Sequence, residues 1–139
     1  MPSLRVYRVY ISHAWDYNAD YKRVVQFLDS APNFAWEDVS VPEHEPIESD
    51  DTETLAYELR NCVRSADVLL VVSGMYVAHS DWIDFEMQFA RRIGTPIIGI
   101  LPWGAERVPT AVQSAAVTLV GWNTSSIVSA IREHALSEL

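Results

Sequence analysis

Glu86 is an acidic residue at a position where an apolar residue is expected. The stretch AHSDWIDFEMQFARRIG, residues 78–94, is typical of a helix, and at about 100° per residue its apolar stripe consists of Trp82, Phe85, Phe89 and Ile93. Glu86 falls inside that stripe. Because burying an unpaired carboxylate is costly, Glu86 needs either a buried hydrogen-bond donor or a cavity that water and ligand enter. In the first case Glu86 is structural, bonded to nearby loop amides or reaching past the edge of the stripe; in the second it marks a site.

The elements that position Glu86 follow from alternating apolar runs and helix-like segments. Strands are predicted at residues 4–12, 34–41, 67–73, 95–104 and 116–122, and helices at 19–30, 54–66, 78–94 and 124–139, with a brief helix at 110–115. Gly94 is predicted to cap the third of these helices. This alternation implies an α/β fold with a parallel sheet, right-handed crossovers and helices on both faces. Five strands favour a flavodoxin-like order 2-1-3-4-5, with the continuous apolar run 67–73 at the centre.

Each predicted helix also has a predicted inward face. The inward residues are Tyr21, Val24, Val25 and Leu28 in the first helix, Leu55, Leu59, Cys62, Val63 and Ala66 in the second, and Ile127, Val128, Ile131 and Leu136 in the last. On this pattern Cys62 is a small core residue rather than a reactive thiol.

Polar and aromatic residues follow the first and third predicted strands. In the order 2-1-3-4-5, ligands bind beyond the carboxyl ends of these two strands, where the chain places Ser12 to Asp16 and Ser73 to Tyr76. His13 and Trp15 lie within the first of these segments. The alternative is a loop capped by serine and aspartate, with an aromatic ring packed over the sheet edge.

The helix that carries Glu86 borders the same crevice, because it follows the third strand. Trp82 lies one turn before Glu86 and would give the crevice a flat aromatic wall beside a carboxylate. The combination predicts a site formed by Glu86 and Trp82 on one side and by Ser12 or His13 on the other.

Several other chemistries lack their motifs. The sequence has neither G-x-G-x-x-G after the first strand nor G-x-x-x-x-G-K-[ST] anywhere, so the usual phosphate-binding loops are not predicted. The four histidines are scattered without metal-ligand spacing, and no metal site is expected. Ser12 and His13 are no catalytic dyad, because neighbours on a strand point to opposite faces.

Composition sets further limits. A length of 139 residues predicts one domain, residues 1–139, and 49% apolar against 21% charged residues predicts a folded one. Ten basic against nineteen acidic residues give a formal net charge of −9, which argues against nucleic-acid binding. No apolar run approaches the roughly 20 residues of a membrane span, and no secretory pattern is seen. With Cys62 as the single cysteine, we expect a cytoplasmic protein without membrane contact.

One long irregular stretch, VSVPEHEPIESDDTE at residues 39–53, is strongly acidic. Residues 37–53 hold eight of the nineteen acids, so the loop is predicted to be solvated and the most mobile part of the chain. A lid or a partner-contact surface is the alternative.

Taken together, these segments resemble the Toll/interleukin-1 receptor (TIR) domains, and among them the TIR-like proteins of the Thoeris anti-phage defence system. The resemblance lies in YISHAWDYNADY, SADVLLVVSGMYVAHSDWIDFEM, GTPIIGILPWG and the later GW, and so covers nearly the whole chain. The spacing from Trp82 to Glu86 matches the family's, whose glutamate is catalytic in TIR domains that cleave NAD. The acidic VPEHEPIESDD departs from the basic loop of many receptor TIR domains and argues against receptor-style assembly through it.

The resemblance implies an enzyme that cleaves the nicotinamide–ribose bond of NAD and releases a cyclic ADP-ribose-type signal for a separate effector. Glu86 would be catalytic, and the substrate-binding residues would be Ser12, His13, Trp15, Ser73, Tyr76 and Trp82. NAD is the substrate, with no metal or added cofactor. Self-association and a phage-derived trigger are the further partners that the resemblance suggests.

Two alternatives stay open at this point. A non-catalytic TIR-like interaction module is favoured by the lack of a basic site for the NAD diphosphate, whereas Glu86 beside Trp82 favours the enzyme. A flavodoxin-like nucleotide-binding domain of unrelated function is the third possibility.

Overall fold

The sheet at the centre of the molecule has five parallel strands. The computed structural model describes residues 5–12, 19–40, 52–72, 80–101 and 109–136. Its strands are β1 (Val6–Ser12), β2 (Ala35–Asp38), β3 (Val68–Val72), β4 (Ile97–Ile100) and β5 (Thr118–Val120), in the order β2-β1-β3-β4-β5. The predicted α/β class and strand order are confirmed, although the strands are shorter than the apolar runs that predicted them.

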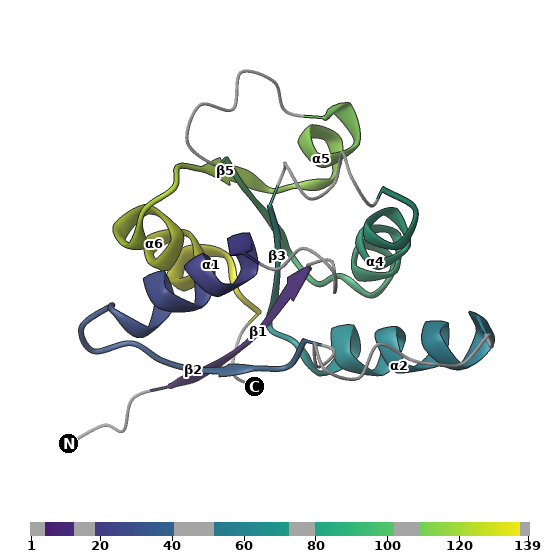
Figure 1. Cartoon of the computed structure of the whole chain (residues 1–139), viewed down its shortest axis with the longest axis horizontal. Coiled ribbons are helices and arrows are strands. Elements are labelled where there is room, and N and C mark those ends of the chain that lie inside the picture. Colours follow the sequence, from purple (N-terminus) through teal and green to yellow (C-terminus); the bar gives the residue numbers. More distant parts are fainter. Residues whose placement is uncertain (1–4, 13–18, 41–51, 73–79, 102–108, 137–139) are drawn as a thin grey trace.

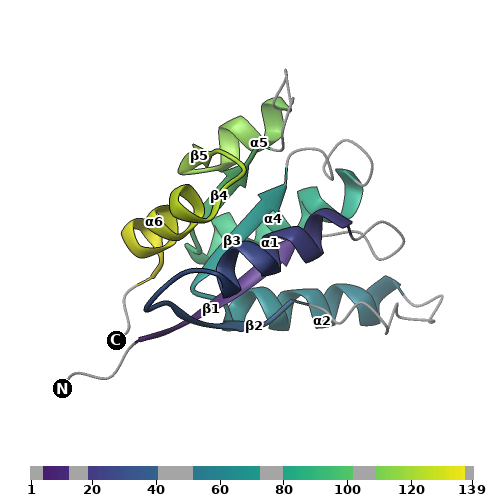
Figure 2. The ribbon, with the colours of Figure 1, turned by 60° about the vertical axis from the view of Figure 1, so that its left-hand side comes forward.

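Helices cover both faces of this sheet. They are α1 (Ala19–Asp29), α2 (Thr52–Ser65), α4 (Ser80–Ile93), α5 (Thr110–Ala115) and α6 (Thr124–His134). Figure 1 shows α1 and α6 on one face, and α2 and α4 on the other with α5 beside α4. In the rotated view of Figure 2, α1 and α6 lie in front of the strands. None of the helices in the described ranges combines the length and apolar character that a membrane crossing requires.

The core is centred on β3, as its apolar sequence predicted. All five of its residues are buried, and so are the four of β4. A strand covered by helices on both faces needs apolar side chains at successive positions, and each buried Val, Leu or Ile contributes about 1.5–3 kcal/mol.

A local hydrogen-bond motif ends α4 at Gly94, as predicted. Gly94 has a φ of +83°, in the left-handed region that glycine tolerates without a Cβ clash. Its N–H donates to the Arg91 carbonyl at 3.3 Å, and the Thr95 N–H donates to the Ala90 carbonyl at 2.8 Å. These are the two bonds of a Schellman motif, which turns the chain from α4 directly into β4.

The buried face of α4 differs from the predicted stripe. Among the α4 side chains that the structure describes, residues 83–93, the buried ones are Ile83, Glu86, Met87 and Ala90, whereas Phe85 and Phe89 are only partly buried and Ile93 is 40% exposed. The physical reason is helix α2, whose arginines stack on the aromatic edge of α4. The Arg60 guanidinium lies 6.0 Å from the Phe85 ring centroid, and that of Arg64 lies 5.5 Å from the Phe89 ring centroid. The face against the sheet is therefore rotated, yet it still contains Glu86.

Two other expectations need revision at element ends. Leu136, predicted inward, is 39% exposed because α6 ends at His134 and the following backbone turns to bond the Asp67 carbonyl. The irregular stretch 39–53 ends earlier than predicted, since α2 begins at Thr52. Residues 41–51 lie outside the described ranges, so the predicted mobility of that stretch stays a prediction.

A partly buried ion cluster joins β1 to the start of β3. Asp67 is 6% exposed and accepts a hydrogen bond from the Arg8 backbone N–H at 2.9 Å. Its carboxylate also lies 3.4 Å from Arg8 Nη2 and 3.6 Å from Arg5 Nη2. This cluster lies at the amino end of β3, at the opposite edge of the sheet from Ser12 at the carboxyl end of β1.

Candidate functional site

Strand alternation on β1 places two hydroxyl groups under the helices α2 and α4. Successive side chains of a strand point to opposite faces, so Tyr10 and Ser12 share one face while Val9 and Ile11 share the other. Tyr10 is 2% exposed and Ser12 is fully buried. Both hydroxyls therefore need partners inside the protein.

Glu86 supplies the partner for both hydroxyls. It is 4% exposed, and its Oε1 accepts a hydrogen bond from Ser12 Oγ at 2.8 Å. The Tyr10 side chain forms a second hydrogen bond with the same carboxyl group. In the part of the chain that the structure describes, the recorded partners of Glu86 are these two hydroxyls and no cation. The carboxylate thus finds buried donors, as its burial requires, but no neutralising charge.

Burial and hydrogen bonding act in opposite directions on the acidity of Glu86. Burial raises the pKa of Glu86 to about 7, and the hydrogen bonds from Tyr10 and Ser12 limit that rise. Near neutral pH the group is therefore present in both charged and neutral forms. A titration in this range is a common property of functional acids.

Two neighbours of Glu86, Tyr10 and Cys62, have raised pKa values. Burial, followed by the charge of Glu86 and the hydrogen bond to it, raises the pKa of the Tyr10 phenol well above its usual value. Burial also raises the pKa of the Cys62 thiol, with contributions from Glu58, Glu86 and Asp38. Within the described ranges, no group of three or more His, Cys, Asp or Glu is arranged to hold a metal ion.

Part of the predicted site can be located and part cannot. Ser12 and Glu86 lie in direct hydrogen-bond contact, and both are buried. His13, Trp15, Ser73 and Tyr76 lie outside the described residues, and Trp82 is placed only by its backbone in α4, one turn before Glu86. The predicted crevice depends on these residues and stays a prediction.

Tyr10 is the site residue that the sequence reasoning missed. It precedes Ser12 by two residues on a strand, so alternation alone placed it on the same face. A tyrosine within an apolar run is typical of a core strand, and nothing local indicates that its hydroxyl meets a glutamate 76 positions later.

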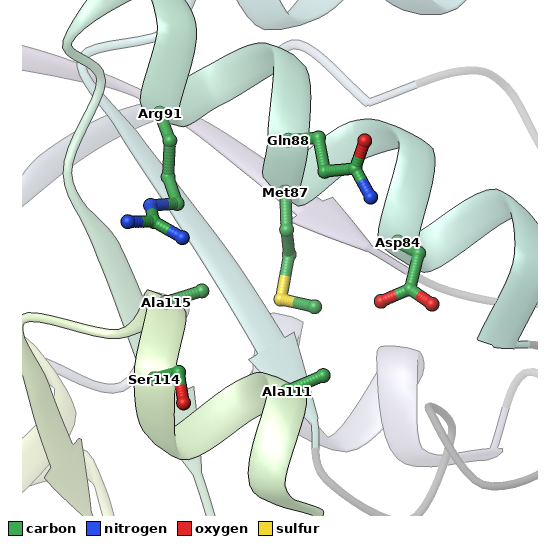
Figure 3. A pocket seen from close by; sticks show the side chains of 7 residues that line it. All are labelled: Asp84, Met87, Gln88, Arg91, Ala111, Ser114 and Ala115. Atoms are coloured by element: carbon green, nitrogen blue, oxygen red, sulfur yellow. The ribbon is translucent and has the colours of Figure 1, made fainter.

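A separate hollow lies between α4 and α5. It has a volume of about 150 Å³, and its lining residues are Asp84, Met87, Gln88, Arg91, Ala111, Ser114 and Ala115. Figure 3 shows Met87 reaching from α4 toward Ala111 and Ala115, with Arg91 and Asp84 to either side. Glu86 does not line this hollow, which is therefore distinct from the candidate site.

The fold and the site together define a class of protein. The strand order 2-1-3-4-5, with a buried acid beneath the carboxyl end of the first strand, is that of a flavodoxin-like α/β domain with a candidate site at its topological switch point. The family described as Thoeris protein ThsB, TIR-like domain, matches residues 10–107, and the chain belongs to this family. The match includes Tyr10, Ser12 and Glu86.

Solved structures share the fold at low sequence identity. A conserved protein from Enterococcus faecalis V583 is 9% identical with a TM-score of 0.60, over 93% of this chain and 99% of that one. The CMP N-glycosidase BcmB from Clostridium botulinum is 16% identical with a TM-score of 0.53, over 91% of this chain and 98% of that one. No curated protein matches the chain. At these identities the two structures establish the fold alone.

Proposed function

We propose that this protein is an NAD-consuming enzyme that cleaves the nicotinamide–ribose bond and makes a cyclic ADP-ribose-type signal in bacterial anti-phage defence. The observation that carries the proposal is the Glu86 carboxylate, buried at the carboxyl edge of the sheet and bonded by hydroxyls alone among the described residues. Membership of the Thoeris TIR-like family supports the same conclusion.

The proposed reaction needs a negative charge beside the ribose carbon C1′. When the bond between ribose C1′ and the nicotinamide nitrogen breaks, its electron pair leaves with nicotinamide, which becomes neutral, and positive charge develops on C1′ and the ring oxygen. A carboxylate held in a water-poor site stabilises that oxocarbenium-like transition state. Glu86 would act in this way, or by binding the ribose hydroxyls. Water, or a hydroxyl of the same molecule, then bonds to C1′ and releases a proton.

The N-glycosidase with the same fold supports the proposed type of bond cleavage. The bond that it cleaves and the nicotinamide–ribose bond are both N-glycosidic, so a domain of this layout can carry such chemistry. In our proposal Trp82 and Tyr76 would enclose the ribose and nicotinamide, and Ser12, His13, Trp15 and Ser73 would line the crevice. No metal or added cofactor takes part, and the product would act on a separate effector.

Substitution of Glu86 tests the proposal. Purified protein is incubated with NAD, with and without an extract of phage-infected cells as the trigger, and products are resolved by mass spectrometry. We expect nicotinamide and a cyclic product from the native protein and neither from Glu86→Gln, which removes the charge and keeps the size. Asp84→Asn makes the same change on α4 at a half-buried position and serves as the control.

Two results would contradict the proposal. Native-like turnover by Glu86→Gln would remove Glu86 from the mechanism. Absence of any NAD cleavage by the native protein under both conditions would favour the alternative, a non-catalytic TIR-like interaction module.

A further inference from the structure

We infer that the Tyr10 and Ser12 hydroxyls form a positioning pair, which holds the Glu86 carboxylate in one orientation and stabilises its charged form. The role of this pair in catalysis rests on the proposed function. The hydrogen bonds themselves are present without substrate. It assigns a role to Tyr10, and it makes Ser12 a partner of Glu86 in addition to a candidate contact for NAD.

Two hydrogen bonds restrict the orientation of the carboxylate. Tyr10 and Ser12 are two residues apart on β1, so their side chains leave the same face of one strand at successive positions. Ser12 Oγ donates to Oε1 at 2.8 Å, and Tyr10 donates to the same carboxyl group. A charged carboxylate only accepts hydrogen bonds, and two donors fixed on a rigid strand limit its rotation. Such support from neighbouring groups keeps a functional side chain in its working geometry.

Both hydroxyls are permanent donors. The pKa of Tyr10 is raised by burial and by the adjacent Glu86, so the phenol keeps its proton when Glu86 loses one. A serine hydroxyl does not ionise in this range. The pair therefore acts on the charged form of Glu86 at every pH near neutrality.

The other charged or titratable groups that act on this cluster do not stabilise a negative charge on Glu86. They are Cys62 and Glu58 on α2 and Asp38 at the end of β2. The nearby arginines of α2, Arg60 and Arg64, stack over Phe85 and Phe89 instead. Among the described residues, the groups found to stabilise the charged form of Glu86 are therefore the hydroxyls of Tyr10 and Ser12.

Neutral donors suit the proposed reaction better than a cation would. An arginine beside Glu86 would stabilise its charge but cancel much of the field that a developing ribose cation feels. Two hydroxyls stabilise the carboxylate and leave its net charge unchanged. The arrangement thus keeps a full negative charge at the site.

The direct test measures the titration of Glu86 without substrate. The side-chain carboxyl carbon of Glu86 is followed by ¹³C NMR from pH 5 to 9 in the native protein, Tyr10→Phe and Ser12→Ala. Loss of either donor removes a hydrogen bond to the charged form, so we expect the pKa of Glu86 to rise in both variants. Tyr7→Phe is the matched control, because Tyr7 lies on β1 with its ring stacked on Phe34 at a centroid distance of 5.2 Å.

A kinetic measurement separates this inference from the proposed function. For each unit by which the pKa rises, kcat/KM for NAD at pH 6 should fall about tenfold, with recovery at pH 9 where Glu86 is charged in every variant. A rate can depend on more than one titrating group, so the Glu86 carbon signal, rather than the rate, assigns the pKa.

The outcomes are distinguishable. A Glu86 pKa that is equal in Tyr10→Phe, Ser12→Ala and the native protein would overturn the positioning pair, even if NAD is cleaved. A raised pKa in a protein that never cleaves NAD would support the pair and contradict the proposed function.

Discussion

Two buried carboxylates, Asp67 and Glu86, lie near opposite ends of the parallel strands and have different hydrogen-bond and ionic partners. They are similarly buried, at 6% and 4% exposure. Asp67 lies against two arginines and a backbone N–H, whereas Glu86 is held by the hydroxyls of Tyr10 and Ser12. The ionic partners of Asp67 bring β1 and β3 together. The neutral partners of Glu86 leave its negative charge without a compensating cation among the described residues.

The comparison shows what makes a buried acid a candidate for chemistry. Burial alone is common to both residues and decides nothing. A cation compensates the charge of Asp67, and such a pair is expensive to break on one side only. Hydroxyl donors satisfy the hydrogen-bonding capacity of Glu86 without that compensation, and its pKa rises to about 7 as a result of burial.

The largest expected effect is a difference in NAD-cleavage activity between a variant of Glu86 and a variant of Asp67. Glu86→Gln and Asp67→Asn make the same chemical change, but only the first removes charge from the proposed site. We expect kcat for NAD cleavage to fall about 10³-fold in Glu86→Gln, as when a preorganised electrostatic group is lost. Asp67→Asn should stay within a few-fold of native activity per folded molecule. Activity is measured by nicotinamide release. Equal losses in both variants would show that Glu86 is no more important for the reaction than Asp67.

The next effect concerns stability and pH at Glu86. The folded pKa of about 7 exceeds the ordinary value of 4.5, so the folded state binds the proton more tightly than the unfolded state. The stability that this provides is present below about pH 4.5 and is lost as pH rises through about 7. Glu86→Gln has no titrating group at this position and so shows no such loss. The free energy of unfolding of the variant, relative to that of the native protein, should therefore increase by up to about 3 kcal/mol between pH 5 and pH 8. Urea unfolding at both values measures the difference, and a constant offset would argue against it.

A smaller loss of stability is expected at the other edge. Asp67→Ala leaves the Arg8 backbone N–H and guanidinium without their acceptor and removes the ion pair with Arg5, which still donates to the Leu136 carbonyl. The free energy of unfolding should fall by about 2 kcal/mol. The Arg8 side chain is 52% exposed and regains water, so the loss should stay below that of a fully buried pair. Urea unfolding at pH 7 measures it, and a change under 0.5 kcal/mol, roughly that of an ordinary surface substitution, would contradict it.

The smallest effect serves as a reference away from both carboxylates. Gly94→Ala places a Cβ in open space but at a φ of +83°, so backbone strain alone should cost about 1 kcal/mol. This cost should be the same at pH 5 and pH 8, in contrast to Glu86→Gln. A pH-dependent cost in thermal unfolding would mean that the end of α4 is coupled to the Glu86 titration.

Local signals in the sequence predicted much of the fold. The apolar run of β3 marked the central strand, and Gly94 marked the end of α4, because both depend on nearby residues. The face of α4 was predicted with the wrong rotation, because Phe85 and Phe89 stack on arginines of α2 that no pattern within α4 reveals. Leu136 was misplaced because the periodicity did not show where α6 ends.

The site was only partly predictable for the same reason. Glu86 was found because a charge inside an apolar stripe is visible in one helix. Tyr10 was missed because its role depends on a hydrogen bond across 76 residues, and a tyrosine in a strand is typical of an ordinary core. Pairing between distant elements, rather than any local preference, decides which buried polar groups meet.

The alternation of β1 has a consequence for how the length of this segment can change. Arg8 bonds to Asp67 near one end of the strand, and Tyr10 and Ser12 bond to Glu86 near the other. Deleting or inserting one residue after Arg8 would turn every later side chain to the opposite face, so that Val9 or Ile11 would face Glu86 while both hydroxyls entered the apolar layer beneath α1 and α6. A single substitution in β1 changes one contact, whereas a single-residue change in its length would remove both donors of Glu86 and disrupt the core together.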